Sequence, residues 1–203
     1  MNFKVHSHRF ALSILETEPQ FTRLWEEIKT ALYSITEEDI ITKFENEHYN
    51  QKSISKTINE LIKERLTSLG WKAESRIFQN RDYSGDTWRL DFAKDLISIE
   101  VAFNHGSVVA WNLLKPVLAG ELNHVKKSIQ TELGVIITAT DKLKVAGGFD
   151  KAIGSYERYV NYLIPLRNQL SIPILLIGLE APKTFRIEHK KIGNRNIGRV
   201  KRI

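Results

Sequence analysis

Two short segments of this chain are apolar on both faces, and they constrain the fold more than any other feature. Residues 134–140 are Gly-Val-Ile-Ile-Thr-Ala-Thr, and residues 172–179 are Ile-Pro-Ile-Leu-Leu-Ile-Gly-Leu. Because successive side chains of a strand point to opposite faces, strands of this kind fit a sheet that is covered on both sides. The sequence therefore predicts an α/β domain with a central mixed β-sheet flanked by helices on both sides.

Helical periodicity predicts the helices that would cover the sheet. Apolar residues recur every three or four positions over 19–34 and 53–69, which predicts two amphipathic helices. The residues Thr36-Glu37-Glu38-Asp39 predict a helix start between them. The remaining expected elements are helices over 110–131 and 149–170, strands over 72–78 and 184–189, and loops over 44–53, 104–106 and 141–148.

The segment Leu90–Phe103 predicts a β-hairpin that carries two carboxylates. With Lys94-Asp95 as a two-residue turn, Asp91 lies opposite Ser98 and diagonal to Glu100 on the same face, about 7–8 Å apart at the backbone. Two acids that approach each other in this way can share a hard divalent cation such as Mg²⁺. A three-residue loop would instead place them on opposite faces.

The chemistry of this hairpin has two interpretations. Bound to Mg²⁺, Asp91 and Glu100 would polarise a phosphodiester oxygen and lower the pKa of an attacking water. The alternative is an exposed hairpin whose acids pair with Arg89 and Lys94. Ala102 counts against a nuclease, because in the D-x(n)-(D/E)-x-K pattern the residue two positions after the second acid is a lysine that orients water.

Five further residues are candidates for the site, each with an ordinary structural alternative. Glu74, on the preceding strand, would supply a third carboxylate or would simply face solvent. Asn104 and His105 follow the second hairpin strand and can contact base edges or phosphate, and His105 could act as a general base. Lys142 and Lys144 lie in a predicted loop that either approaches a nucleic-acid backbone or is a surface connection.

Charge is concentrated at the C-terminus. Residues 183–203 contain eight Lys or Arg and one acid, Glu188, for a net charge of +7, whereas the whole chain carries +6. A near-neutral body with a basic tail favours a polyanionic partner, most simply nucleic acid. The alternative is a solvated, disordered end.

Length and composition limit the class of protein. At 203 residues without cysteine, the chain is expected to form a single domain over 1–203, and disulfides and thiolate zinc sites are excluded. No apolar run approaches the roughly 20 residues of a membrane span, and the first residues do not resemble a signal peptide. We therefore expect a cytoplasmic protein that has no membrane partner.

The acidic hairpin resembles the active-site strand pair of the BglII/BstYI group of type II restriction endonucleases, in the PD-(D/E)xK nuclease superfamily. In that group an Asp-Phe and a Glu-Val-x-Phe stand at the spacing of Asp91-Phe92 and Glu100-Val101-Ala102-Phe103. The similarity extends over most of the chain, through residues 24–28, 58–63, 71–72, 135–138, 172–174 and 177–179.

The resemblance implies a restriction-endonuclease-like fold in which Asp91 and Glu100 are catalytic, metal-binding carboxylates for Mg²⁺ and Glu74 is a further active-site residue. Ala102 departs from the group, where this position is usually Gln, Glu or Lys. A substrate phosphate, a metal-bound water or a residue such as His105 would then have to take over the activation of water.

The resemblance also implies a homodimer that cuts double-stranded DNA at a palindrome with a central GATC and leaves four-base 5′ overhangs. The members most similar in pattern and length imply purine-GATC-pyrimidine, cut after the purine. The helices expected over 110–131 and 149–170 are the candidates for the dimer interface. The segments expected to approach DNA contain Asn104, His105, Lys142, Lys144, Arg195 and Arg199.

Two other functions remain open from the sequence. The first is a DNA-binding module without catalysis, which would act without Mg²⁺. The second is a structure-specific nuclease on the same scaffold, whose products would follow the shape of the DNA and not its sequence.

Overall fold

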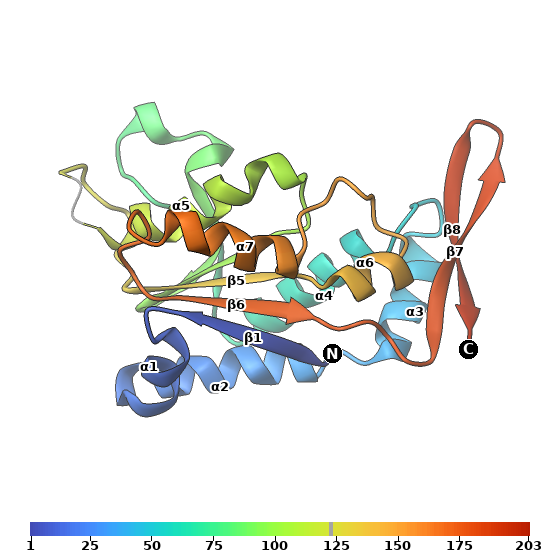
Figure 1. Ribbon diagram of the computed structural model, residues 1–203, viewed down its shortest axis with the longest axis horizontal. Helices are drawn as coiled ribbons and strands as arrows, with labels where there is room; N and C mark the ends of the chain where they lie inside the picture. The colour runs from blue at the N-terminus through green and yellow to red at the C-terminus, as the bar shows by residue number, and fades with distance from the viewer. Residues whose placement is uncertain (122–123) are drawn as a thin grey trace.

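The computed structural model describes residues 1–121 and 124–203. At its centre is a six-stranded mixed sheet in the order β1-β6-β5-β4-β3-β2 (Figure 1). Strands β4, β5 and β6 run parallel, and the outer pairings β1–β6, β4–β3 and β3–β2 are antiparallel. The strands are β1 (Phe3–His8), β2 (Lys72–Arg76), β3 (Arg89–Lys94), β4 (Ile97–Val101), β5 (Leu133–Ala139) and β6 (Ile174–Leu179).

Helices cover both faces of this sheet. In Figure 1, α1 and α2 lie on one side of it and α5 and α7 on the other. Every residue of β5 and β6 is buried, as the two apolar segments predict, and the expected α/β class is confirmed. The helices are α1 (Ala11–Thr17), α2 (Pro19–Tyr33), α3 (Glu37–Glu47), α4 (Ser55–Ser68), α5 (Val109–Gly120), α6 (Asp141–Ala146) and α7 (Tyr156–Leu166), with short 3-10 turns at Arg81–Tyr83, Asp86–Trp88 and Gly106–Val108.

Local signals explain where several helices begin. Pro19 occupies the first turn of α2, where its missing N–H costs nothing. The Thr36 hydroxyl accepts a 3.0 Å hydrogen bond from Asp39 N, and the Asp39 carboxylate accepts one from Thr36 N. This capping box confirms the predicted start of α3. No helix of the described residues is long and apolar enough to cross a membrane.

Two predicted loops are partly helical. Residues 141–146 form α6, and the Thr140 hydroxyl caps it by accepting a hydrogen bond from Leu143 N. The loop expected over 44–53 begins only after Glu47, where α3 ends. In both places short polar helices lack the long apolar stripe that identifies a helix in sequence.

Two predicted helices are shorter than expected. The helix expected over 110–131 ends at Gly120, and residues 122–123 lie outside the described residues. Beyond them the chain pairs with the loop after β2, where Gln79 N donates to Lys126 O at 2.9 Å. The helix expected over 149–170 covers only Tyr156–Leu166. Strand β1, which the sequence did not predict, pairs with β6 over its whole length.

The basic C-terminal segment is an ordered hairpin. Strands β7 (Phe185–Ile192) and β8 (Arg195–Arg202) pair antiparallel and project beyond the sheet (Figure 1). Phe185 and Ile187 are buried at its base, and Ile197 is buried nearer its turn. The Glu37 carboxylate of α3 also accepts hydrogen bonds from the backbone N–H groups of Lys183 and Thr184. These contacts fix the hairpin to the body of the protein.

Candidate active site

The β3–β4 hairpin has a two-residue turn, but the turn lies one residue later than predicted. Lys94 pairs with Ile97, so Asp95 and Leu96 form the turn, and Asp95 has a φ of 46°. The continuing register brings Asp91 directly opposite Glu100, not diagonal to it. Because both alternatives are two-residue turns, the prediction that the acids share a face holds.

At Asp91 and Glu100, the side-chain carboxylates accept hydrogen bonds from backbone N–H groups of the two strands. Val101 N donates to Asp91 Oδ2 at 2.7 Å, and Asp91 N donates to Glu100 Oε1 at 3.3 Å. The carboxylates therefore lie in the opening between β3 and β4. Backbone donors hold both of them in place before any ligand arrives.

Burial makes this pair electrostatically unfavourable. Glu100 is 2% exposed, and desolvation together with the adjacent Asp91 charge raises its pKa to about 8. Burial also raises the pKa of Asp91, against the hydrogen bond from Val101. Adjacent acids that are at least half-buried and have raised pKa values are typical of a functional site.

A lysine that the sequence analysis missed contacts Glu100. Lys115 Nζ lies 2.7 Å from Glu100 Oε2, and both side chains are buried. Lys115 is the one charged residue of α5, a helix that is otherwise almost entirely apolar, and this contrast is the sequence signal that could have found it. Helix α5 packs closely on β5, because a Cβ on Gly134 would lie 2.4 Å from Pro116 Cβ.

A cleft of about 210 Å³ opens beside Asp91, between α4 and strands β2 and β3. Glu74 lines it, is exposed and has a φ of 51°. Its charge raises the pKa of Asp91, whereas the charge of Lys63 lowers it. Glu74 does not join Asp91 and Glu100 in a cluster whose ligand atoms all lie within 4.8 Å. The residues that line the cleft are Lys56, Asn59, Glu60, Lys63, Ala73, Glu74, Asp91 and Phe92.

The donor set of Asp91 and Glu100 fits a hard divalent cation. Both are oxygen ligands, and a cation between them would offset the repulsion that raises their pKa values. Among the described residues, a three-ligand cluster occurs elsewhere, at Glu47, His48 and Glu60. There the Lys43 ammonium already lies 2.8 Å from Glu47 and 3.5 Å from Glu60, so that cluster has a cation of its own.

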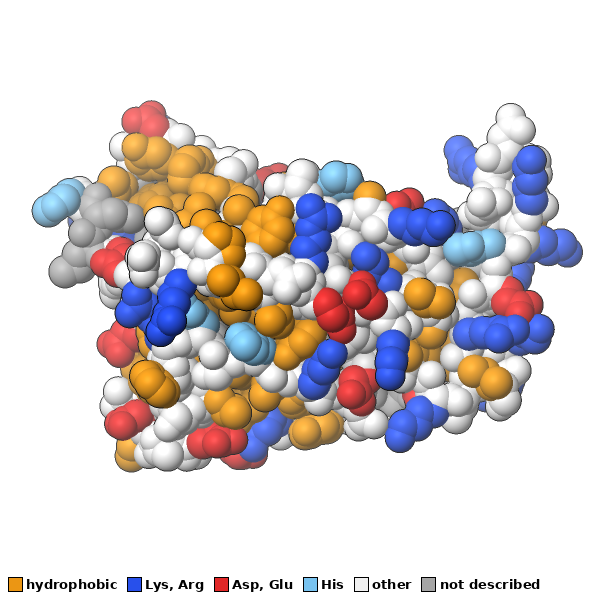
Figure 2. Space-filling view, in the orientation of Figure 1, with side chains coloured by type: hydrophobic (Ala, Val, Ile, Leu, Met, Phe, Trp, Pro, Cys, Tyr) orange, Lys and Arg blue, Asp and Glu red, His pale blue; other side chains and the backbone are white. Residues whose placement is uncertain are grey.

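Four of the six residues predicted to contact DNA lie in two regions. Asn104 and His105 are exposed just beyond β4, where Asn104 Oδ1 accepts from Asn112 Nδ2 at 3.0 Å and His105 Nδ1 accepts from Ser107 N at 3.1 Å. Arg195 and Arg199 lie on β8 of the projecting hairpin, whose surface is strongly basic (Figure 2). Both regions follow the C-terminal ends of parallel strands, β4 and β6, and therefore lie toward the same end of the sheet.

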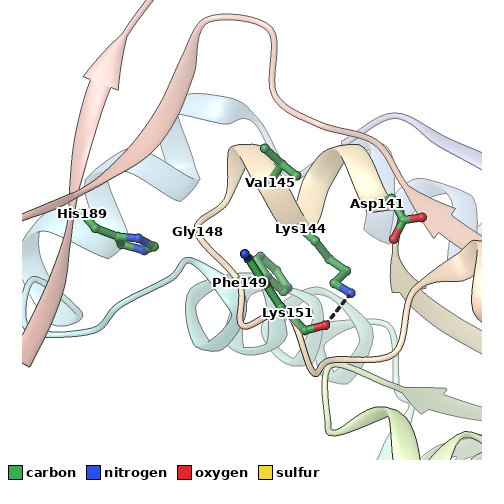
Figure 3. A pocket seen from close by; sticks show the side chains of 7 residues that line it. All are labelled: Asp141, Lys144, Val145, Gly148, Phe149, Lys151 and His189. Atoms are coloured by element: carbon green, nitrogen blue, oxygen red, sulfur yellow. Dashed lines mark hydrogen bonds between the residues drawn. The ribbon is translucent and has the colours of Figure 1, made fainter.

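Between the two regions, α6 and β7 border a cavity of about 430 Å³ (Figure 3). Lys144 lines it, but its Nζ donates to Ile153 O at 2.6 Å and to Lys151 O at 3.3 Å. This lysine therefore braces the loop that follows α6. Lys142 is exposed on the same helix. The residues that line the cavity are Asp141, Lys144, Val145, Gly148, Phe149, Lys151 and His189.

Comparisons with known proteins support one family. A family model described as restriction endonuclease BglII/BglIII matches residues 3–179. Among solved structures, BglII complexed with a DNA 16-mer has a TM-score of 0.69 at 19% identity, with 100% of both chains covered. Free BglII has a TM-score of 0.54 at 20% identity, with 100% of this chain and 93% of the other covered. The search of curated proteins finds no match.

Proposed function

The chain belongs to the BglII/BglIII restriction endonuclease family, and we propose that Asp91 and Glu100 are the carboxylates with which it hydrolyses DNA in the presence of Mg²⁺. The observation that carries this proposal is the pair itself. A half-buried acid, Asp91, and a buried acid, Glu100, face each other across β3 and β4, held by backbone donors and by a lysine, within the segment that the family model matches.

The residues divide the chemistry between them. When bound, Mg²⁺ would supply Lewis acidity and a water of lowered pKa, and Asp91 and Glu100 are the side chains that would hold it. Water would attack the phosphorus and lose a proton, while the bond to the 3′-oxygen breaks and that oxygen takes up a proton, so the products carry a 5′-phosphate and a 3′-hydroxyl. Glu74, with Lys56 and Lys63 of α4, lines the cleft beside Asp91 and would face the DNA backbone.

The proposed site is a palindrome with a central GATC. The chain resembles BstYI in pattern and length, which favours purine-GATC-pyrimidine, cut after the purine to leave four-base 5′ overhangs. Distinguishing a purine from a pyrimidine takes fewer hydrogen bonds than distinguishing all four bases. We therefore propose that the protein lacks a direct contact at the outer base pair of the site. Asn104, His105, Lys142, Lys144, Arg195 and Arg199 are the residues proposed to contact DNA.

A palindromic site suits a two-fold symmetric protein, and an apolar surface supports a homodimer. Apolar side chains gather on the face formed by α5 and α7 (Figure 2). On α5, Ala110, Trp111 and Leu114 are only half-buried, and on α7 Ile164 is 75% exposed. We propose that the second subunit covers this face and that the dimer acts on DNA in the cytoplasm.

The test is cleavage of a sequenced plasmid with Mg²⁺, with EDTA as the control, followed by sequencing of the fragment ends. We expect ends at purine-GATC-pyrimidine with 5′ overhangs. Cleavage that follows DNA structure, or metal-independent binding without cleavage, would contradict the proposal. Equal cutting at every outer base combination would contradict the purine–pyrimidine assignment alone.

A single variant tests the carboxylate assignment. Asp91→Asn should lower the cleavage rate by at least about 10³-fold, because it removes a charged ligand of the cation. DNA binding in Ca²⁺ should stay within about threefold of the unmodified protein, since phosphate contacts supply most of the affinity. Full cleavage by this variant would show that the site lies elsewhere.

A further inference from the structure

The position two residues after Glu100 carries no polar group in this protein. Ala102 is 1% exposed and packs in an apolar cluster with Val109 and Leu113 of α5. A methyl group can neither orient a water nor stabilise charge on a phosphate. If Asp91 and Glu100 hold the cation, the site needs another group for this task.

A lysine side chain from another element, α5, reaches the Glu100 carboxylate. Lys115 enters from α5, 15 residues after Glu100, and its Nζ lies 2.7 Å from Glu100 Oε2. Its side chain is 11% exposed. Within the described residues Lys115 Nζ makes this one hydrogen bond, which leaves two of its three N–H donors for other acceptors.

The fold fixes this lysine in place. The close approach of Pro116 to Gly134 holds α5 against β5, and β5 lies beside β4 in the sheet. Lys115 precedes Pro116 directly, so its backbone is held against the sheet, and the 2.7 Å contact with Glu100 holds its ammonium group. A long side chain that is held in this way is pre-organised for its contact.

We propose that Lys115 supplies the positive charge that Ala102 cannot, as a positioning residue for Glu100. It fixes the orientation of the Glu100 carboxylate and neutralises one of two adjacent negative charges until a divalent cation is bound. Its two remaining N–H donors are available to orient a water or to stabilise charge on a phosphate, the task that a polar residue at position 102 would otherwise perform. This inference rests on the proposed roles of Asp91 and Glu100.

A purely structural ion pair is the rival explanation, and the chain offers a matched control for it. Lys94 Nζ lies 2.7 Å from Glu27 Oε2, and both side chains are 17% exposed. This pair lies near the turn end of the same hairpin, outside the candidate site. Lys94→Met therefore reports what the loss of a partly buried lysine does to the fold alone.

The experiment compares Lys115→Met, Lys94→Met and the double variant Lys115→Met with Ala102→Lys. Lys115→Met should lower the single-turnover cleavage rate by about 10²-fold or more, with Ca²⁺-supported DNA affinity changed by less than about threefold. Lys94→Met should cleave at the unmodified rate. The double variant should recover at least about tenfold of the lost rate, because a lysine again reaches the site from position 102.

A second readout does not use cleavage at all. Without DNA, Lys115→Met should bind Mn²⁺ about tenfold more tightly than the unmodified protein, because the competing ammonium is gone and a buried negative charge is left uncompensated. A structural role predicts no such gain. Lys115→Gln, which keeps a donor toward Glu100 without the charge, should show the same direction if Lys115→Met fails to fold.

The outcomes separate this inference from the proposed function. If Asp91→Asn binds Mn²⁺ and cleaves like the unmodified protein, the proposed site is wrong. If Asp91→Asn loses both but Lys115→Met and Lys115→Gln cleave within about threefold of normal, the site stands and the role of Lys115 is overturned. A loss in Lys115→Met that Ala102→Lys does not recover, with unchanged Mn²⁺ affinity, also overturns it.

Discussion

The β3–β4 hairpin has a lysine–glutamate ion pair near each of its ends. At the turn, Lys94 Nζ lies 2.7 Å from Glu27 Oε2. At the other end, Lys115 Nζ lies 2.7 Å from Glu100 Oε2. The two contacts have the same length, so the difference between them lies in their surroundings.

The turn-end pair is fully satisfied. Lys94 also donates to Leu69 O at 2.7 Å, and Glu27 also accepts from Trp71 Nε1 and Arg23. Its side chains keep some access to water. Every charge has an opposite partner or a polar neighbour, which is what a pair that serves only the fold requires.

The other pair retains an unbalanced charge. Glu100 is almost completely buried, and its one ammonium partner must oppose both desolvation and the Asp91 carboxylate. Its pKa is about 8 as a result. The same hairpin therefore has an ion pair that stabilises the fold at one end and, at the other end, two acids whose repulsion a bound cation would relieve.

The largest expected difference between the two ends is in catalysis. Glu100→Gln should reduce Mg²⁺-dependent cleavage by about 10³-fold or more, because it removes a charged ligand, whereas Glu27→Gln should leave the rate within about threefold. Single-turnover cleavage of a GATC-containing duplex measures both. Equal losses in the two variants would mean that both pairs serve only the fold.

The second difference is in stability, and it runs the other way. Lys94→Met should lower the free energy of unfolding by about 1–3 kcal/mol, because it leaves Glu27 partly buried with fewer partners. At about pH 5, where Glu100 is already protonated in the folded protein, Glu100→Gln should change it by less than about 1 kcal/mol. Urea unfolding in EDTA measures both values. A large loss in Glu100→Gln alone would reverse the comparison.

The third difference is in the response to pH. Folding raises the pKa of Glu100 from an ordinary 4.5 to about 8, so the folded state favours the protonated acid. This stabilisation is complete below about pH 4.5 and is lost as the pH rises toward 8. The melting temperature in EDTA should fall over that interval through Glu100. Glu100→Gln should flatten the decline and Glu27→Gln should not; identical profiles would contradict the assignment.

The smallest expected effect is on DNA binding, and it compares the β7–β8 hairpin with Arg23, which lies beside Glu27 of the turn-end pair. Arg195→Ala with Arg199→Ala should weaken DNA binding in Ca²⁺ by about tenfold and reduce the salt dependence of log K by about one for each lost phosphate contact. Arg23→Ala, an exposed arginine beside Glu27, should leave both unchanged. Titrations over a series of KCl concentrations measure these slopes. If Arg23→Ala weakened DNA binding equally, the effect would come from the net charge of the protein and not from phosphate contacts of the hairpin.

Alternation along strands was enough to predict that Asp91 and Glu100 share a face. The register was wrong because long-range contacts decide it: Lys94 is held in the strand by Glu27 and by Leu69 O. No local pattern in the hairpin contains those partners. A tertiary contact thus moved the turn by one residue and brought the acids directly opposite each other.

The layers of the fold were predictable and the third member of the site was not. Both-sided apolar strands are visible in the sequence, but Lys115 reaches Glu100 only because α5 folds back onto the sheet at Gly134. Strand β1 escaped prediction because its residues, Phe-Lys-Val-His-Ser-His, are mostly polar at a sheet edge. Local patterns identify elements, whereas the site depends on how those elements pack.

The most direct test of the account is the position of a bound cation. Crystals of the protein with a GATC-containing duplex and Mn²⁺ would locate the metal by its anomalous scattering. The account predicts a peak bonded to the carboxylates of Asp91 and Glu100. A peak at Glu47, His48 and Glu60, with none between β3 and β4, would contradict it.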